Sequence, residues 1–349
     1  MKKKSVAALL LALCCTLSAC TSAAPGAETE SVQPTQEETQ EVQQSTEAPV
    51  FVDEMTMEDV EIGEEMIPMA TNPAAVPIML VPVASGTKVA KANGAEIDYS
   101  NTKDGYVMVR FPGSSAKALK VRVTGPSGTN YDYNLPVGSA WSTFPLSDGN
   151  GAYKVMALQN TTGKKYAVLA TASFTASMTD QFAPFLRPNQ YVNYEGAVNT
   201  IAKAAELTGS IADPLEKVAA VYNYVVKTLT YDKARAQAVS SGQLTGYLPD
   251  LDSVLAKKQG ICFDYAALMT GMLRSQGVPC KLVVGYAGDV YHAWVSVWTE
   301  TTGWVDNAIF FDGTTWHRMD PTFASSGNKS DAIMKFIGNG TNYSTKYLY

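Results

Sequence analysis

The chain has 349 residues, of which 46% are hydrophobic and 10% aromatic, so it is long enough for two domains with packed cores. The formal net charge is −6, but residues 21–87 hold 13 acidic side chains and no Lys or Arg. Without this stretch and the first twenty residues, the chain is only mildly basic. This excludes the strongly positive surface of a nucleic-acid-binding protein. We therefore expect no nucleic-acid partner.

The first twenty residues predict a secretory signal peptide. The basic start Lys2–Lys4 precedes the apolar run SVAALLLALCCTL, which is too short for a stable transmembrane span, and LSAC follows. This ending resembles the lipobox of bacterial lipoproteins, whose cysteine becomes the lipidated first residue. The resemblance implies a lipid on Cys20 that anchors the protein to the extracytoplasmic face of the cell membrane. An ordinary cleaved signal peptide is the alternative.

Residues 21–50 are mostly Glu, Gln, Thr, Ser, Ala and Pro. Such a stretch cannot bury enough apolar surface to offset its ordering entropy, so we expect a disordered acidic linker. A solvated tether behind the anchor is favoured over an acidic binding tail. Residues 51–75 form a transition segment in which no pattern predicts a structure.

Residues 76–178 have the sequence pattern of a β-domain. Runs that alternate apolar and polar residues are separated by the turn signals PGSS, GPSG and SDGNG. The runs are GYVMVRF, ALKVRVTG, AYKVMALQ and KKYAVLATASF. They predict a β-sandwich, immunoglobulin-like in architecture, although the Cys-Trp-Cys pattern of antibody domains is absent. No catalytic constellation lies in it, so a spacer or docking role is expected.

Residues 180–349 begin with helical patterns. Asp213 is a good N-cap, Pro214 suits the first helical position, and Glu216 has capping-box spacing. One apolar face follows at helical spacing: Leu215, Val218, Ala219, Tyr222, Val225, Val226 and Leu229. A second helix is predicted for LDSVLAKKQ, with Asp252 as its cap and Gly260 as its stop.

A third helix is predicted from Cys262, in GICFDYAALMTGML, to the breakers Gly277 and Pro279. A thiolate is favoured in the first turn of a helix, where the helix dipole is positive. The runs KLVVGYA, YHAWVSVW and WHRMDPTF then predict strands.

The five cysteines separate by position. Cys14 and Cys15 leave with the signal peptide and Cys20 is assigned to lipid, so only Cys262 and Cys280 remain in the folded part. A disulfide is common in an exported protein, but Cys280 lies in a strand-like run that indicates buried core. We expect both thiols to be free.

The mature chain holds two histidines, His292 and His317. His292 opens HAWVSVW, where alternation puts it on one face of a strand with Trp294, Ser296 and Trp298. Asp320 follows in RMDPT. A cysteine at a helix start, a histidine on a strand and an aspartate on a neighbouring strand can form a nucleophilic triad, in which the histidine moves the proton and the aspartate orients it.

GICFDYA around Cys262, HAW at 292–294 and DPT at 320–322, in that order, resemble the core of the transglutaminase-like superfamily. LTYD at 229–232 and GVPCKLVVGYA add to the resemblance, which covers roughly 190–325. It implies a papain-like α+β domain over 180–349 with Cys262 as nucleophile, His292 as base and Asp320 as orienter. The segment before Asp320 is longer than compact members have, so Asp306 and Asp312 stay open as third members.

The sequence also predicts roles for several further residues. The oxyanion would be stabilised by the Cys262 N–H and, as the resemblance implies, by Tyr231, which could instead be a buried residue closing the preceding helix. Asp264 is given no catalytic role because its charge would oppose a thiolate, and His317 is expected to be a surface or packing residue. Four aromatic residues either line the cleft or, more commonly on strands, belong to the core: Tyr286, Tyr291, Trp294 and Trp298.

No metal-binding or phosphate-binding motif occurs, so no cofactor and no metal are expected. The resemblance implies acyl transfer on peptide or glutamine amides through a thioester, in a peptide or protein substrate, with hydrolysis favoured over cross-linking. The alternatives are a non-catalytic binding or scaffold lipoprotein that keeps the fold, and a β-domain that itself binds a wall component or partner.

Overall fold

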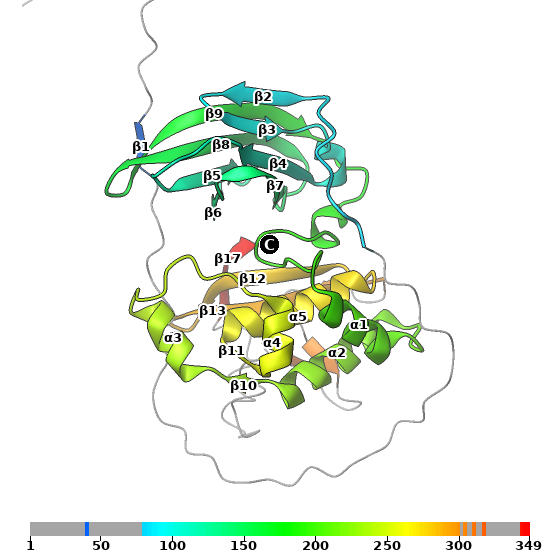
Figure 1. Cartoon of the computed structure of the whole chain (residues 1–349). Helices are drawn as coiled ribbons and strands as arrows, with labels where there is room; N and C mark the ends of the chain where they lie inside the picture. Colours follow the sequence, from blue (N-terminus) through cyan, green and yellow to red (C-terminus); the bar gives the residue numbers. More distant parts are fainter. Residues whose placement is uncertain (1–38, 42–78, 301–302, 306–308, 312–315, 319–342) are drawn as a thin grey trace, which may run out of the picture. The chain divides into compact units, whose positions relative to one another are not determined.

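The structure is a computed structural model that describes residues 39–41, 79–300, 303–305, 309–311, 316–318 and 343–349. The signal peptide with Cys20, the transition segment 51–75 and the three candidate aspartates at 306, 312 and 320 lie outside the described residues. Within the described part, the chain is a mixed α and β protein, β-rich up to residue 176 and helical after it (Figure 1).

The β-rich part contains two antiparallel sheets. One has the order β2 (Val89–Ala92), β3 (Ala95–Asp98), β4 (Tyr106–Phe111), β7 (Gly138–Pro145). The other has the order β1 (Thr39–Glu41), β9 (Lys165–Ala176), β8 (Gly151–Thr162), β5 (Leu119–Thr124), β6 (Asn130–Asn134).

Buried side chains from both sheets share one core, as in a sandwich. Ile97 and Val109 of one sheet are 0% exposed, and so are Val121 and Val155 of the other. The four alternating runs of the sequence are β4, β5, β8 and β9, which confirms the predicted strands. The apolar side chains of β5 enter this core, while the polar side chains that alternate with them, Lys120 and Arg122, are also largely covered. Within the 21–50 stretch, Thr39–Glu41 pair with residues 165–167 of β9.

The remaining elements are five helices and a sheet around the fifth helix. The helices are α1 (Val198–Thr208), α2 (Pro214–Thr228), α3 (Lys233–Ser240), α4 (Leu251–Lys257) and α5 (Cys262–Ser275). The antiparallel sheet has the order β14 (Gly303–Val305), β13 (Val290–Thr299), β12 (Cys280–Ala287), β17 (Tyr343–Leu348).

Four short elements complete the description. β10 (Thr230–Tyr231) and β11 (Gln259–Gly260) form a parallel pair, and β15 (Ile309–Phe311) and β16 (Trp316–Arg318) form an antiparallel pair. Single 3-10 turns occur at 102–104 and 183–185.

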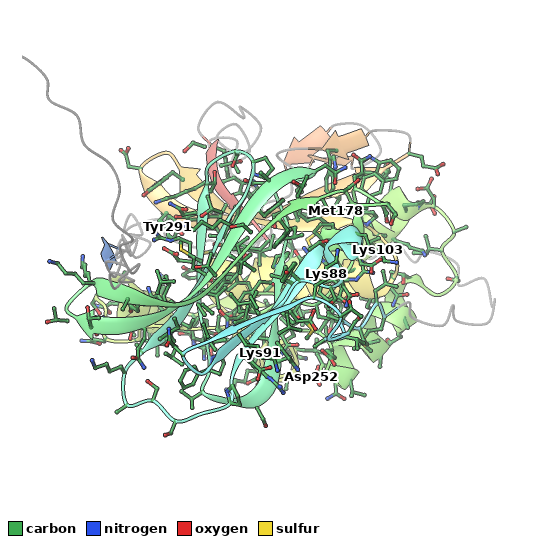
Figure 2. The ribbon with its side chains drawn as sticks, turned by 90° about the horizontal axis from the view of Figure 1, so that it is seen from above. Lys88, Lys91, Lys103, Met178, Asp252 and Tyr291 are labelled. Atoms are coloured by element: carbon green, nitrogen blue, oxygen red, sulfur yellow. The ribbon has the colours of Figure 1, made fainter. Side chains whose placement is uncertain are left out.

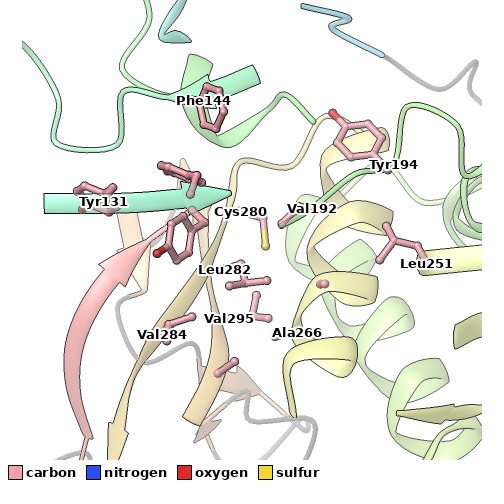
Figure 3. Packing of buried hydrophobic residues seen from close by; sticks show 14 of the residues in the cluster. Tyr131, Phe144, Val192, Tyr194, Leu251, Ala266, Cys280, Leu282, Val284 and Val295 are labelled. Atoms are coloured by element: carbon pink, nitrogen blue, oxygen red, sulfur yellow. The ribbon is translucent and has the colours of Figure 1, made fainter. Parts of the chain in front are cut away.

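Helix α5 is the centre of this second part. It packs against α1, α2 and α4 and against strands β12 and β13. Figure 3 shows Leu282 and Val284 of β12 and Val295 of β13 on the side of Ala266, and these side chains are at most 8% exposed. Because α5 is surrounded in this way, almost all of its residues are buried, including the polar Asp264 and Arg274.

Helix α2 begins as its sequence predicts. The Asp213 carboxylate accepts hydrogen bonds from the backbone N–H groups of Leu215 (2.6 Å) and Glu216 (3.4 Å), and Pro214 occupies the first helical position. Its buried residues are Val218, Val221, Tyr222 and Val225.

The predicted cap of α4 is wrong by two residues. Asp250, not Asp252, is the N-cap and accepts from the Ser253 N–H at 3.0 Å. Asp252 (labelled in Figure 2) instead caps α1, whose own N-cap, Ala197, has no side-chain acceptor. Its carboxylate accepts from the N–H groups of Asn199 (3.1 Å) and Thr200 (2.8 Å). A cap supplied from 53 residues away leaves no local pattern to find.

Arg274 ties the end of α5 to its surroundings. Its guanidinium is 0% exposed and donates to the carbonyl oxygens of Cys280 (2.8 Å), Arg187 (2.8 Å) and Tyr349 (2.6 Å). Burial lowers the pKa of Arg274 to about 10. The side chain stays protonated at neutral pH and satisfies three carbonyl groups at once. Among the residues described, no helix is both long and apolar enough to cross a lipid bilayer.

Candidate active site

Cys262 is the first residue of α5, and its thiol is free. The preceding residue, Ile261, is extended (φ −96°, ψ 176°) and has no polar side chain with which to cap the helix. The Asp264 carboxylate takes over part of that role by accepting from the Ile261 N–H at 2.8 Å. The first N–H groups of a helix have no partner within it, so the backbone at Cys262 presents donors and positive potential near the sulfur.

The Cys262 side chain is buried. Its exposure is 3%, and it belongs to the core cluster that includes Tyr265 and Ala266 of the same helix. A nucleophile needs a path to its substrate, and a residue that is only 3% exposed offers little of one. A substrate can therefore reach this sulfur only when surrounding side chains move.

Tyr231 lies near the start of α5. It pairs with Gly260 in the parallel β10–β11 bridge, and the Asp232 N–H donates to the Gly260 carbonyl at 2.9 Å. The pKa of Tyr231 is raised, first by burial and then by the charge that Cys262 would carry. The pairing thus places Tyr231 next to the peptide that leads into α5. Its role in binding an oxyanion stays a prediction.

His292 lies on β13 and is 1% exposed. It pairs with Gly285 of β12, and its ring lies 6.4 Å from that of Trp294 at an interplanar angle of 22°. Ala293 and Val295 join the core with α5, and His292 and Trp294 alternate with them along the strand. Because Ala293 and Val295 face α5, the alternation turns His292 and Trp294 toward the other face of the sheet.

Tyr291 shares the face of β13 that carries Ala293, opposite to the face of His292. Its pKa is raised, chiefly by burial, and a negative charge on Cys262 would raise it further. Tyr291 (labelled in Figure 2) also packs edge-on against Tyr286, with ring centroids 5.5 Å apart.

The four aromatic residues divide between the two expectations. Trp294 is 1% exposed and packs edge-on against Tyr343, with ring centroids 5.1 Å apart, so it is core. The ring of Trp298 packs on that of Phe182, with ring centroids 4.3 Å apart. Tyr286, Tyr291 and Trp298 are partly buried, so partial burial leaves these three open to contact with a substrate.

Gly285 makes the close packing on this strand possible. A Cβ atom there would lie 2.0 Å from the Ser344 carbonyl oxygen and 2.8 Å from the Trp294 ring. Any side chain at 285 would push β17 away from β12 or displace Trp294. The residue paired with His292 is therefore a glycine for a steric reason.

Sequence reasoning missed a polar cluster at the start of α5. Asp264 is 0% exposed, and its Oδ1 accepts from the Tyr247 hydroxyl at 2.6 Å. Arg235 donates to the same hydroxyl at 2.9 Å, and its Nη1 lies 3.6 Å from Asp264 Oδ2. The one signal available beforehand was the position of a carboxylate in the first turn of an otherwise apolar helix. Its partners lie 17 and 29 residues earlier in the chain.

The third triad member is not located, because Asp306, Asp312 and Asp320 lie outside the described residues. His317 lies in β16, paired with Phe310. In the described part of the chain, no group of three or more His, Cys, Asp or Glu side chains could hold a metal ion.

Cys280 is the core residue that its sequence predicts. It is 0% exposed and free, and burial raises the pKa of its thiol to about 12. The expectation that Cys262 and Cys280 do not form a disulfide is confirmed.

Comparison with protein families gives one match, in which residues 201–321 fit the model of the transglutaminase-like superfamily. The match includes Cys262, His292 and Asp320. A search of curated proteins found none that matches this chain.

Solved structures with a similar arrangement are distant in sequence. A "putative cysteine protease" from Cytophaga hutchinsonii is 11% identical, with a TM-score of 0.34, over 75% of this chain and 78% of that one. Red sea bream transglutaminase is 13% identical, with a TM-score of 0.28, over 68% of this chain and 54% of that one. A structure described as a TGase is 18% identical, with a TM-score of 0.27, over 50% of this chain and 45% of that one.

Proposed function

Because residues 201–321 match the model of the transglutaminase-like superfamily, we propose that this chain is a cysteine-dependent acyl-transfer enzyme acting on peptide or glutamine amides. Cys262 is the nucleophile, His292 the general base and acid, and Asp320 the residue that orients the imidazole. These residues belong to a papain-like domain over 180–349.

One observation carries the proposal most directly. A free cysteine is the first residue of the central helix, and Tyr231 is paired with Gly260, two residues before it. A purely structural cysteine could lie anywhere along α5, whereas the first turn is where the helix dipole favours a thiolate and where backbone N–H groups are free to bind an oxyanion.

The reaction follows from these groups. The Cys262 thiolate attacks the amide carbonyl carbon, and the negative charge on the resulting oxyanion is stabilised by the Cys262 N–H and the Tyr231 hydroxyl. The carbon–nitrogen bond breaks as the His292 imidazolium gives its proton to the leaving amine, which leaves a thioester. An incoming water gives a proton to His292 and attacks the thioester, which releases a carboxylic acid and restores the thiolate.

We propose water rather than a protein amine as the acyl acceptor. Cys262 is only 3% exposed, so a small acceptor reaches it with less rearrangement than a lysine side chain on a second protein. Transfer to an amine would also need water to be kept out of the site.

The N-terminal residues determine where the enzyme would act. We propose that residues 1–20 are a lipoprotein signal and that a lipid on Cys20 holds the protein at the extracytoplasmic face of the cell membrane. The expected linker 21–50 is not disordered throughout, because Thr39–Glu41 pair with β9, so we propose a disordered tether only up to residue 38. A flexible tether of that length has a root-mean-square reach of roughly 20–25 Å. The β-sandwich, proposed as an immunoglobulin-like domain over 76–178, would act as spacer or docking module.

A non-catalytic scaffold is the second candidate, and the burial of Cys262 is the observation that favours it. The two are separated by incubating the protein with peptide libraries, with and without a primary amine, and reading the products by mass spectrometry. Products with a mass change of hydrolysis or amine addition, absent with Cys262→Ala, support the enzyme. Unchanged peptides under all conditions support the scaffold.

A further inference from the structure

The side chain of Asp264, two residues after Cys262, folds back over the start of its own helix. Its Oδ2 accepts from the Ile261 N–H at 2.8 Å. Gly260 makes this possible, because a Cβ atom at that position would lie 2.5 Å from the Asp264 Cβ. The glycine and the aspartate on either side of Cys262 therefore form one steric unit. The missing side chain leaves room for the carboxylate that holds the peptide before the cysteine.

The other carboxylate oxygen is held from outside the helix. Tyr247, in the connection between α3 and α4 (Figure 1), donates to Oδ1 at 2.6 Å. Arg235 of α3 donates to the Tyr247 hydroxyl at 2.9 Å and lies 3.6 Å from Oδ2. Asp232, the N-cap of α3, lies 3.5 Å from Arg235. We call these four residues the Asp264 cluster.

This cluster is more elaborate than a helix cap requires. A cap needs one acceptor for a backbone N–H, and the bond from Ile261 already supplies that. The additional bond from Tyr247 immobilises a carboxylate that is 0% exposed. Burial raises the pKa of Asp264, and the bonds from Tyr247 and Ile261 oppose that rise. A buried carboxylate is expensive unless its oxygens are paired, so the cluster as a whole fixes its position.

We propose that Asp264 and Tyr247 are positioning residues for Cys262. The Tyr247 hydroxyl holds the Asp264 carboxylate, and the carboxylate holds the Ile261 N–H. Together they fix the Ile261–Cys262 peptide, and with it the sulfur and the backbone donor for the oxyanion. This inference rests on the proposed acyl transfer, because that reaction needs the sulfur and the donor in a fixed geometry.

Three substitutions remove the hydrogen bonds of the Asp264 carboxylate to different extents. Tyr247→Phe removes only the outer hydrogen bond, Asp264→Asn keeps an acceptor for the Ile261 N–H, and Asp264→Ala removes both bonds. A misplacement of about 1 Å costs on the order of a hundredfold in rate. We expect kcat to fall about tenfold for Tyr247→Phe and Asp264→Asn and about a hundredfold for Asp264→Ala, with KM nearly unchanged.

Tyr131→Phe is the matched control. The Tyr131 hydroxyl donates to Asp148 Oδ1 at 2.9 Å in the sandwich, so this substitution removes the same type of bond away from the cysteine. We expect it to lower Tm about as much as Tyr247→Phe does, with kcat unchanged. Because Asp264→Ala could fail to fold, the positioning role is tested by comparing kcat and Tm of Tyr247→Phe with those of Tyr131→Phe.

A second measurement does not depend on turnover. In the Cys280→Ala background, the rate of Cys262 alkylation by iodoacetamide and the hydrogen exchange of the Ile261 amide should change with Tyr247→Phe and Asp264→Asn. If neither variant alters kcat, alkylation or exchange more than Tyr131→Phe does, the positioning role is refuted. If the parent protein converts no amide, yet alkylation still follows the graded order, the proposed function fails and the positioning of Cys262 stands.

Discussion

Tyr231 and Gly260 are paired side by side in a parallel bridge, 29 residues apart in the chain. Gly260 lies two residues before Cys262, so the pairing holds Tyr231 at the start of the central helix. The proposed oxyanion role requires this position.

Replacing Tyr231 by Phe should therefore slow catalysis more than it affects folding. Loss of one oxyanion donor costs about a hundredfold in kcat, and KM should change little because the donor acts on the transition state. Steady-state kinetics on a peptide amide would measure both. Tyr194→Phe is the control, since it removes a buried hydroxyl that donates to the Leu186 carbonyl at 2.8 Å. Equal losses of kcat in the two variants would count against the oxyanion role.

Asp252→Ala should destabilise the protein through a helix to which residue 252 does not belong. The carboxylate caps α1, and loss of a cap costs about 1–2 kcal/mol. Burial raises the pKa of Asp252, but the hydrogen bonds from Thr200 and Asn199 outweigh it and hold the pKa below its ordinary 3.8. The stabilisation is thus complete above pH 3.8 and is lost as the pH falls through the lower folded value.

Urea unfolding at neutral pH and below pH 3 would measure this dependence. The difference between the wild-type protein and Asp252→Ala should be largest at neutral pH and shrink in acid. Asp250→Ala, which removes a cap of α4 only, gives the comparison. A difference that does not change with pH would mean that the carboxylate charge plays no part.

The two thiols of the folded part should differ in chemistry. Burial raises the pKa of Cys280 to about 12, so it stays a neutral thiol over the usable pH range and should resist iodoacetamide in the native protein. Peptide mapping by mass spectrometry should find native labelling at Cys262 only, and labelling of both residues in denaturant. Cys280→Ala should leave kcat unchanged, whereas Cys262→Ala should abolish turnover. Native labelling of Cys280 would contradict the packing described here.

Cys20→Ala should release the protein from the membrane. Metabolic labelling with an alkyne fatty acid should mark the wild-type protein and not this variant, which should move to the soluble fraction. Cys15→Ala changes a neighbouring cysteine that leaves with the signal and should still be labelled. Fatty-acid labelling that persists in Cys20→Ala would refute the lipoprotein proposal.

Local patterns were sufficient for much of this fold. The strands β4, β5, β8 and β9 follow from alternation, and α2 follows from Asp213 and Pro214. In each case the deciding interactions lie within a few residues. The free state of Cys262 and Cys280 also followed from reading one as a helix start and the other as core.

Interactions between distant residues explain what the sequence did not reveal. Helix α1 takes its cap from Asp252, 53 residues away, and the Asp264 carboxylate takes its partners from α3 and the loop after it. Burial of Cys262 could not be foreseen either, because it depends on how α1, α2 and α4 close around α5. Such partners are found only when the chain is folded.

The three carbonyl groups held by Arg274 come from parts of the chain that are far apart in sequence. One of them belongs to Tyr349, which directly follows β17, the strand that pairs with β12. A chain cut before residue 343 would leave a buried cation without one of these partners and one edge of β12 open. Docking of residues 343–349 therefore completes both the surroundings of Arg274 and the sheet on which α5 packs.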